Sequence, residues 1–268
     1  MLNYRKKMFP DADFPLLFGH RGCSKAAPEN TLAAFRKIKE YRVPGVELDI
    51  QLCRTGELIV FHDSNLKRIT GIDANLADTD FETLRSLDIG AGFGDEFSGE
   101  KIPTLDEVLD CLGDSVYYDI EIKNWQKKEF PMEKALVKTL QKRKFSNRIV
   151  VSSFNPYSLR TVKRLNPEIK TALIYTKHPG FPNWLSRGAG RFICRPLFLK
   201  PNRERLKPFM VFWKKVVLGY PLVTWTEDDE TAVRRYLEMG MDGIISNQPE
   251  KLLPLIKEYR NKAQGQIL

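Results

Sequence analysis

Short apolar runs alternate along the chain with longer segments whose apolar residues recur at helical spacing. Nine runs are rich in β-branched and aromatic residues, as buried strands are. They are Leu16–Gly19, Val46–Leu52, Leu58–Phe61, Val116–Ile122, Ile149–Ser153, Thr171–Tyr175, Phe192–Arg195, Leu222–Trp225 and Gly243–Ser246. The predicted helices between or after them include Thr31–Tyr41, Glu133–Lys144, Pro156–Leu165, Asp228–Met239 and Pro249–Tyr259. This alternation favours a parallel sheet with helices outside it.

The spacing of the second and third runs identifies the architecture. Only Cys53 to Glu57 separate them, whereas parallel strands need a crossover of about a dozen residues, so we expect an antiparallel hairpin. Eight parallel strands remain, which favours an α/β fold of the (β/α)8 TIM-barrel type. Residues 64–103 are rich in glycine and contain one helical piece near Phe81–Leu87, so they predict a small insertion after the second barrel strand. We expect residues 1–268 to form a single domain.

Composition narrows the class of protein. The chain has 268 residues, of which 42% are hydrophobic and 29% charged, and this excludes a disordered chain. No stretch reaches the roughly 18 apolar residues of a membrane span, and the basic N-terminus is not followed by the apolar core of a signal peptide. We therefore expect a cytoplasmic protein. Its four cysteines lie far apart, which excludes a disulfide framework and a zinc knuckle.

The net charge of +9 indicates either a solvated basic surface or a preference for anionic partners such as phosphate esters and acidic lipid headgroups. No basic helix or aromatic-interleaved strand suggests nucleic-acid binding. The stretch from Phe181 to Tyr220 is basic and aromatic. It predicts an outer helix with its core face, or a surface in peripheral contact with an anionic membrane.

Acidic residues gather on two of the predicted barrel strands. Glu47 and Asp49 alternate on one strand, and Asp119, Glu121 and Lys123 alternate on the next barrel strand, so each set projects to one side. If that side is the barrel interior, the carboxylates converge and need a positive partner. Oxygen ligands favour one divalent cation, Mg²⁺ or Ca²⁺. The alternative for Glu47 or Asp49 alone is an ordinary ion pair on the helix side.

Two of the three histidines, His20 and His62, end predicted strands beside these carboxylates. Such a pair suits acid–base catalysis, with one deprotonating a nucleophile and the other protonating an alkoxide leaving group. Arg21 and Lys123 add positive charge for a phosphoryl group, and the combination points to phosphodiester cleavage. We assign no role to His178.

Three further residues are weaker candidates for the site. Trp225 ends the seventh barrel strand, where it is either core or a wall for the alcohol. Asn30 is a plausible N-cap for the first helix. Glu29 or Asn30 could also contact the cation.

The ordered motifs Gly19-His20-Arg21-Gly22, Pro28-Glu29-Asn30-Thr31, Glu47-Leu48-Asp49, His62-Asp63, Glu121-Ile122-Lys123 and Trp225-Thr226 resemble the glycerophosphodiester phosphodiesterase family. The resemblance implies a TIM barrel that hydrolyses glycerophosphodiesters to sn-glycerol 3-phosphate and an alcohol. It implies His20 as general base and His62 as general acid. It also implies Glu47, Asp49 and Glu121 as ligands of Mg²⁺ or Ca²⁺, Arg21 and Lys123 as phosphate ligands, and Trp225 in the glycerol site.

The sequence departs from the family pattern at three places. Cys23 follows the His-Arg-Gly triplet, Ser246-Asn247 stands where the family more often has Thr-Asp, and residues 181–220 match poorly. One alternative is a lysophospholipase D-like enzyme on the same scaffold that acts on lysophospholipids at membranes. Another is a binding module that senses phosphodiesters without turnover.

Overall fold

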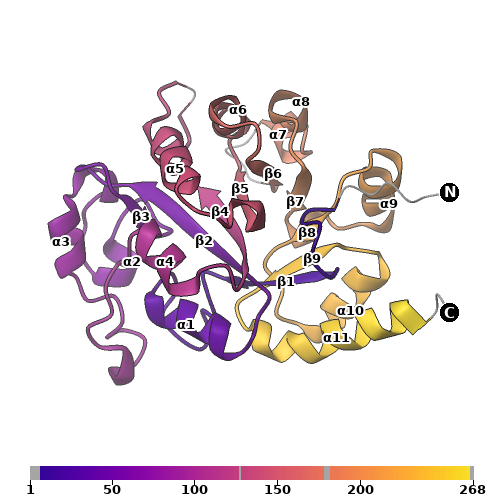
Figure 1. Cartoon of the computed structure of the whole chain (residues 1–268), viewed down its shortest axis with the longest axis horizontal. Coiled ribbons are helices and arrows are strands. Elements are labelled where there is room, and N and C mark those ends of the chain that lie inside the picture. Colours follow the sequence, from indigo (N-terminus) through magenta and orange to yellow (C-terminus); the bar gives the residue numbers. More distant parts are fainter. Residues whose placement is uncertain (1–6, 127, 178–181, 266–268) are drawn as a thin grey trace.

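The computed structural model describes residues 7–126, 128–177 and 182–265. Eight parallel strands surround one axis with helices outside them (Figure 1). The strands are β1 (Leu16–His20), β2 (Gly45–Leu52), β4 (Tyr117–Ile122), β5 (Ile149–Ser153), β6 (Lys170–Tyr175), β7 (Phe198–Pro201), β8 (Val223–Thr224) and β9 (Gly243–Ser246).

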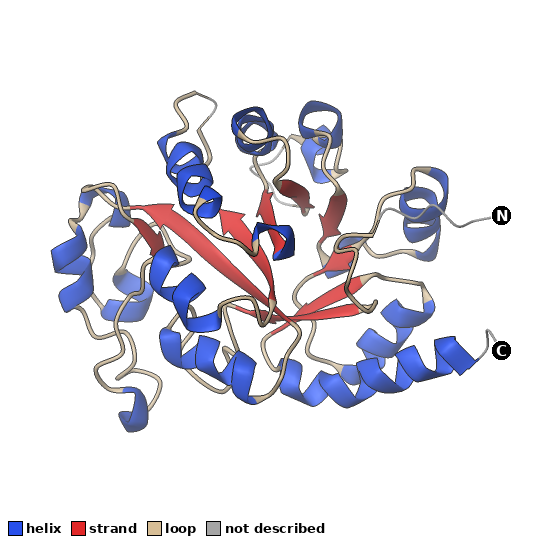
Figure 2. Ribbon diagram, viewed as in Figure 1, coloured by secondary structure: helices blue, strands red, loops and turns tan. Residues whose placement is uncertain are grey.

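Hydrogen bonds join these strands in the order β7-β6-β5-β4-β2-β1-β9-β8. Two single bridges, Leu199 with Leu222 and Asn202 with Trp225, bring the β8 segment next to β7. The sheet is therefore a nearly closed barrel of eight parallel strands, and the predicted fold class is confirmed (Figure 2).

The predicted hairpin is present as β2 and the short antiparallel strand β3 (Leu58–Val60). Residues 64–103 follow it and contain α2 (Lys67–Thr70), α3 (Phe81–Ser86) and short 3-10 turns. Their apolar side chains form a small cluster with the hairpin, which includes Leu66, Leu76 and Ile89. The insertion therefore has a local core of its own beside the barrel.

The outer helices follow the strands that they cover. They are α1 (Leu32–Glu40), α4 (Leu105–Leu112), α5 (Pro131–Gln141), α6 (Pro156–Leu165), α7 (Asn183–Ser186), α8 (Arg191–Cys194), α9 (Pro208–Phe212), α10 (Glu230–Glu238) and α11 (Pro249–Gly265). Pro131 and Pro156 stand in the first turns of α5 and α6, where a missing N–H costs no hydrogen bond. None of the helices among the described residues is long and apolar enough to cross a membrane.

Alternation along the strands sorts apolar from polar side chains. The residues that face the helices, such as Val46, Leu48 and Ile120, belong to the large outer core. The opposite face fills the lower barrel with Phe18, Tyr117 and other apolar side chains. Met8, Phe9 and Ala12 belong to the same cluster and close the barrel end at which the strands begin. Higher along the strands, the interior positions become polar.

One predicted strand is wrong. Residues Phe192–Arg195 include the short helix α8 instead, and the sixth barrel strand is β7 (Phe198–Pro201). Phe192 is 73% exposed, so the apolar alternation of that run does not mark burial. The true strand contains Lys200 and Pro201, two residues that a buried strand seldom carries.

Candidate active site

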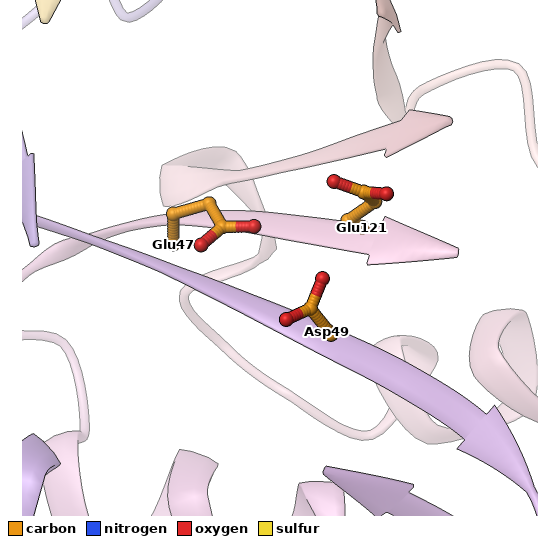
Figure 3. Close-up of side chains that lie close together, drawn as sticks. All are labelled: Glu47, Asp49 and Glu121. Atoms are coloured by element: carbon orange, nitrogen blue, oxygen red, sulfur yellow. The ribbon is translucent and has the colours of Figure 1, made fainter. Parts of the chain in front are cut away.

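Three acidic side chains meet at the carboxyl end of the barrel (Figure 3). Glu47 and Asp49 come from β2 and Glu121 from β4, and the strand register pairs Asp49 with Glu121. One oxygen of each carboxylate lies within 4.8 Å of the others, and all three residues are buried. The predicted convergence is therefore observed for these three. Asp119 points to the same interior at the deep side of the cluster, level with Glu47 in the strand register, and pairs with Lys200.

The charges in this cluster are only partly balanced. Burial and the neighbouring Asp49 charge hold the pKa of Glu47 well above its usual range. Burial acts the same way on Asp49, but the charges of Lys123 and Arg21 outweigh it and lower the pKa of that carboxyl. Three crowded oxygen donors fit a hard divalent cation such as Mg²⁺ or Ca²⁺. The donor set holds no thiolate and no imidazole.

Both predicted phosphate ligands lie at the cluster. The Nζ of Lys123 is 2.6 Å from Glu121 Oε1 and 3.0 Å from Asp49 Oδ1. The Nε of Arg21 is 3.2 Å from Asp49 Oδ2, and its backbone N–H donates to Glu47. Each cation therefore contacts a carboxylate of the cluster.

His20 is held in one orientation by a chain of hydrogen bonds. Its Nδ1 lies 2.7 Å from Oδ1 of Asn247, and the amide of Asn247 donates to Asp228 Oδ2 at 2.8 Å. Because Asp228 fixes the amide nitrogen on its own side, the oxygen of Asn247 faces His20 and Nδ1 must donate. The lone pair is then on Nε2. Burial and the charge of Arg21 lower the pKa of His20 to about 4, so the ring is neutral near pH 7.

His62 is held by a different network. Its Nδ1 donates to Asp63 Oδ1 at 2.6 Å, and the second oxygen of Asp63 accepts from Nε of Arg68 at 2.5 Å. Burial raises the pKa of Asp63, but the hydrogen bonds from Arg68 and His62 outweigh it and the net shift is downward. Asp63 and Arg68 therefore hold the His62 ring in one orientation.

Arg68, on helix α2 of the insertion, also donates to Glu29 at 2.6 Å, and Glu29 accepts from Arg21 at 2.8 Å. The insertion is therefore connected to both sides of the site. Glu29 is not one of the three clustered carboxylates. Asn30 donates to Asp49 Oδ2 at 3.0 Å, so it contacts a candidate ligand. The prediction that Asn30 caps the first helix is wrong, because Thr31 is the N-cap and accepts from the Ala34 N–H.

A cavity of about 870 Å³ opens beside these groups. His62, Lys123 and Arg68 line its polar part, and Trp125, Phe154 and Trp225 line its aromatic part. Phe154 lies between the two indoles, with ring centroids 5.8 Å from Trp125 and 5.6 Å from Trp225. Trp225 is thus at the mouth, as predicted. His178 lies outside the described residues.

Several residues of the site were not predicted to act there. Asn247 and Asp228 orient His20, and Asp63, next to His62, orients that ring. The sequence could have indicated a role for Asn247, because it is a polar residue at the end of the last strand. It gave no such indication for Arg68 and Lys200, because their partners become neighbours only after folding.

Cys23, which the sequence left without an account, is buried in the outer core, where its backbone N–H donates to Ala34 O. Burial raises the pKa of its thiol to about 12. Its side chain therefore packs in the core as a neutral thiol.

Comparison with known proteins places this site in context. Residues 20–251 match the model of the glycerophosphoryl diester phosphodiesterase family. The chain is 36% identical over 244 residues to a glycerophosphodiester phosphodiesterase of Caldanaerobacter subterraneus subsp. tengcongensis, covering 91% of this chain and 98% of that one. A putative glycerophosphodiester phosphodiesterase of Bacillus subtilis is 30% identical, over 88% of this chain and 96% of that one.

Solved structures show the same architecture. A phosphodiesterase of Oleispira antarctica, solved in complex with the product sn-glycerol-3-phosphate, is similar with a TM-score of 0.81. It is 28% identical, and the match covers 92% of this chain and 97% of that one. A glycerophosphodiester phosphodiesterase of Thermotoga maritima is similar with a TM-score of 0.72 and 27% identity, over 91% of this chain and 99% of that one.

Proposed function

The chain belongs to the glycerophosphoryl diester phosphodiesterase family, and from that premise we propose that it hydrolyses glycerophosphodiesters to sn-glycerol 3-phosphate and an alcohol. The observation that carries the proposal is the pair of oriented imidazoles beside three converging carboxylates and a cavity. His20 and His62 are fixed by different partners, which suits them to opposite roles.

His20 acts as the general base. Its Nδ1–H is committed to Asn247, its Nε2 keeps a lone pair, and its lowered pKa keeps it neutral. The Nε2 takes the proton of the attacking hydroxyl as the new P–O bond forms. Water attacks directly, or the substrate's own glycerol hydroxyl attacks to give a cyclic phosphate, which water then opens to sn-glycerol 3-phosphate. His62, oriented by its hydrogen bond to Asp63, gives a proton to the oxygen of the departing alcohol as the old P–O bond breaks.

Glu47, Asp49 and Glu121 are the residues that would hold one Mg²⁺ or Ca²⁺. When bound, such an ion supplies positive charge to the phosphodiester. Arg21 and Lys123 donate hydrogen bonds to the phosphoryl oxygens and orient them, which neutralises charge that develops during the displacement. Trp225, with Phe154, gives the organic part of the substrate an apolar wall.

The test is release of sn-glycerol 3-phosphate from glycerophosphocholine and glycerophosphoethanolamine, with Mg²⁺, with Ca²⁺ and with EDTA. Release that EDTA abolishes supports the proposal, and absence of release under every condition contradicts it. His20→Ala and His62→Ala should each lower turnover by about 10²–10⁴-fold. His178→Ala, which removes the third histidine, should leave turnover unchanged.

Metal binding is tested without turnover. Calorimetric titration of Mg²⁺ or Ca²⁺ into the chain should show binding that Glu121→Gln weakens at least tenfold, since one of three charged donors is lost. Equal binding by both proteins contradicts the assigned ligands.

Turnover only on lysophosphatidylcholine vesicles would instead assign the lysophospholipase D-like activity.

A further inference from the structure

The segment Pro208–Val217, which forms α9 and the π-helical turn after it, turns its apolar face to solvent. Five of its side chains stand at positions i, i+3, i+4, i+7 and i+8, the spacing of one helix face. They are Phe209, Phe212, Trp213, Val216 and Val217, with exposed fractions of 74, 54, 45, 43 and 48%. We call them the outward stripe. In Figure 1, α9 lies at one edge of the molecule, opposite α3 of the insertion.

The polar side chains of the same segment point inward. Lys215 lies 2.8 Å from Asp242 Oδ1 and also donates to the carbonyl of Gly240. Lys214 donates to the carbonyl of Arg187 at 3.4 Å. Turning the helix to bury the stripe would break these bonds and leave Asp242 without its ion-pair partner. The inward hydrogen bonds therefore fix the apolar face toward solvent. An exposed apolar patch of this kind is typical of a surface that binds an apolar partner.

Positive charge lies near the outward stripe. Residues 182–220 hold nine Lys and Arg against one acidic residue, Glu204. Three of the nine, Lys200, Lys214 and Lys215, are buried, and the other six remain at least partly exposed. Next to α9, Arg187, Arg205 and Lys207 line a cavity of about 390 Å³, together with Met210, Lys214, Tyr175 and Glu204. This basic cavity has the size and charge for an anionic headgroup. An apolar stripe beside a basic cavity matches a surface whose charge is negative and whose interior is hydrocarbon.

A second copy of the chain matches this surface poorly. In a two-fold dimer the same patch faces itself, so the arginines and Lys207 around one stripe would meet those around the other. The exposed stripe also amounts to only on the order of 500 Å², the size of a large patch on a monomer. A stable interface uses about 800 Å² per partner and carries few charges at its centre.

We propose that the outward stripe and the adjoining basic cavity dock this enzyme on an anionic lipid bilayer. Phe209, Phe212 and Trp213 enter the interface between headgroups and acyl chains, and Lys207, Arg187 and Arg205 contact lipid phosphates. Docking would place a phosphodiesterase at the surface where phospholipids are broken down. The inference does not depend on the proposed catalytic roles.

The test is co-sedimentation with vesicles of equal parts phosphatidylglycerol and phosphatidylcholine, and with phosphatidylcholine vesicles. We expect binding to the anionic vesicles that exceeds binding to the neutral ones at least tenfold and falls as salt rises. Phe209→Ser/Trp213→Ser should lose at least tenfold in binding. Lys207→Glu, which reverses one charge, should lose at least about fivefold. Phe93→Ser, which removes an exposed aromatic ring of the insertion, is the matched control and should bind as the unchanged protein does.

Thermal unfolding of each variant shows that it is folded, whether or not the enzyme is active on the chosen substrate. Equal binding to both vesicle types, or equal binding by the stripe variants and Phe93→Ser, overturns the proposal. A dimer in solution that the stripe variants convert to monomers, without any vesicle binding, also overturns it and assigns the stripe to a second copy.

Discussion

Nδ1 of His20 lies 2.7 Å from Oδ1 of Asn247, although the two residues are 227 positions apart in the sequence. Their strands, β1 and β9, are neighbours in the barrel, and the register pairs Gly19 with Ser246. The hydrogen bond thus joins the first strand to the last at the mouth. It fixes both the plane of the imidazole and the nitrogen that carries the proton.

Replacement of Asn247 should therefore damage catalysis more than substrate binding. In Asn247→Ala, the Nδ1–H of His20 loses its acceptor, and the ring is free to rotate or change tautomer. We expect kcat to fall about 10–100-fold with KM changed less than threefold. Gln248→Ala, at the next position, is the control and should keep normal turnover. An unchanged kcat in Asn247→Ala would show that His20 needs no such support.

The insertion should influence His62 through Arg68. Arg68→Ala removes the charge-assisted hydrogen bond that Arg68 donates to Asp63 and the two that it donates to Glu29, so His62 loses part of its orientation. We expect kcat to fall about tenfold, and Arg68→Lys should restore only part of it because an ammonium cannot bridge both carboxylates as a guanidinium does.

Lys67→Ala is the matched control for Arg68, since it removes a positive charge from the same helix and Lys67 pairs with exposed Asp73. Steady-state kinetics on glycerophosphocholine measures all three variants. An equal loss of turnover in Lys67→Ala and Arg68→Ala would mean that net charge at the mouth matters and that the link to Asp63 does not.

Below the acidic cluster, Lys200 and Asp119 form an ion pair inside the barrel. Nζ of Lys200 is 2.6 Å from Asp119 Oδ2 and donates to Ser152 Oγ at 3.1 Å, and both charged residues are buried. Lys200→Met leaves Asp119 uncompensated, so we expect the free energy of unfolding to fall by about 3–5 kcal/mol. Urea denaturation measures the change.

The double variant Lys200→Met/Asp119→Leu removes both charges. We expect it to be more stable than Lys200→Met alone, because Asp119 is no longer left as a buried charge without its partner. A double variant that loses the sum of the two single effects would mean that the pair is not coupled.

The strand count, the hairpin and the convergence of Glu47, Asp49 and Glu121 could be predicted because they follow from local rules. A five-residue connection forces antiparallel pairing, and alternation puts i and i+2 on one face. Strand β7 could not be found this way. Lys200 breaks the apolar run of that strand, and its ion-pair partner, Asp119, is distant in the sequence.

The residues that orient the two histidines also divide into a sequence neighbour and partners that are distant in the sequence. Asp63 adjoins His62 in the sequence, so their contact is local. Asn247 and Arg68 reach the site only through the closure of the barrel and the packing of the insertion. The direction of the apolar face of α9 also depends on which side the barrel covers, and helical spacing alone does not reveal that side.

Two buried thiols should make stability fall in alkaline solution. Burial raises the pKa of Cys23 and of Cys194 to about 12, whereas the ordinary value is 9.0. Their contribution to the free energy of unfolding is therefore complete below pH 9 and is lost as pH rises from 9 toward 12. The reason is that these two thiols ionise at a lower pH in the unfolded chain than in the folded one. Between pH 8 and pH 10.5, the unfolding free energy of the unchanged protein should fall further than that of Cys23→Ala/Cys194→Ala, by up to about 1.4 kcal/mol per thiol and pH unit above 9. Urea midpoints at both pH values measure the difference, and other titrating groups cancel in the comparison. Cys111→Ala, at a half-buried position, is the control; parallel pH profiles for all three proteins would contradict the assignment.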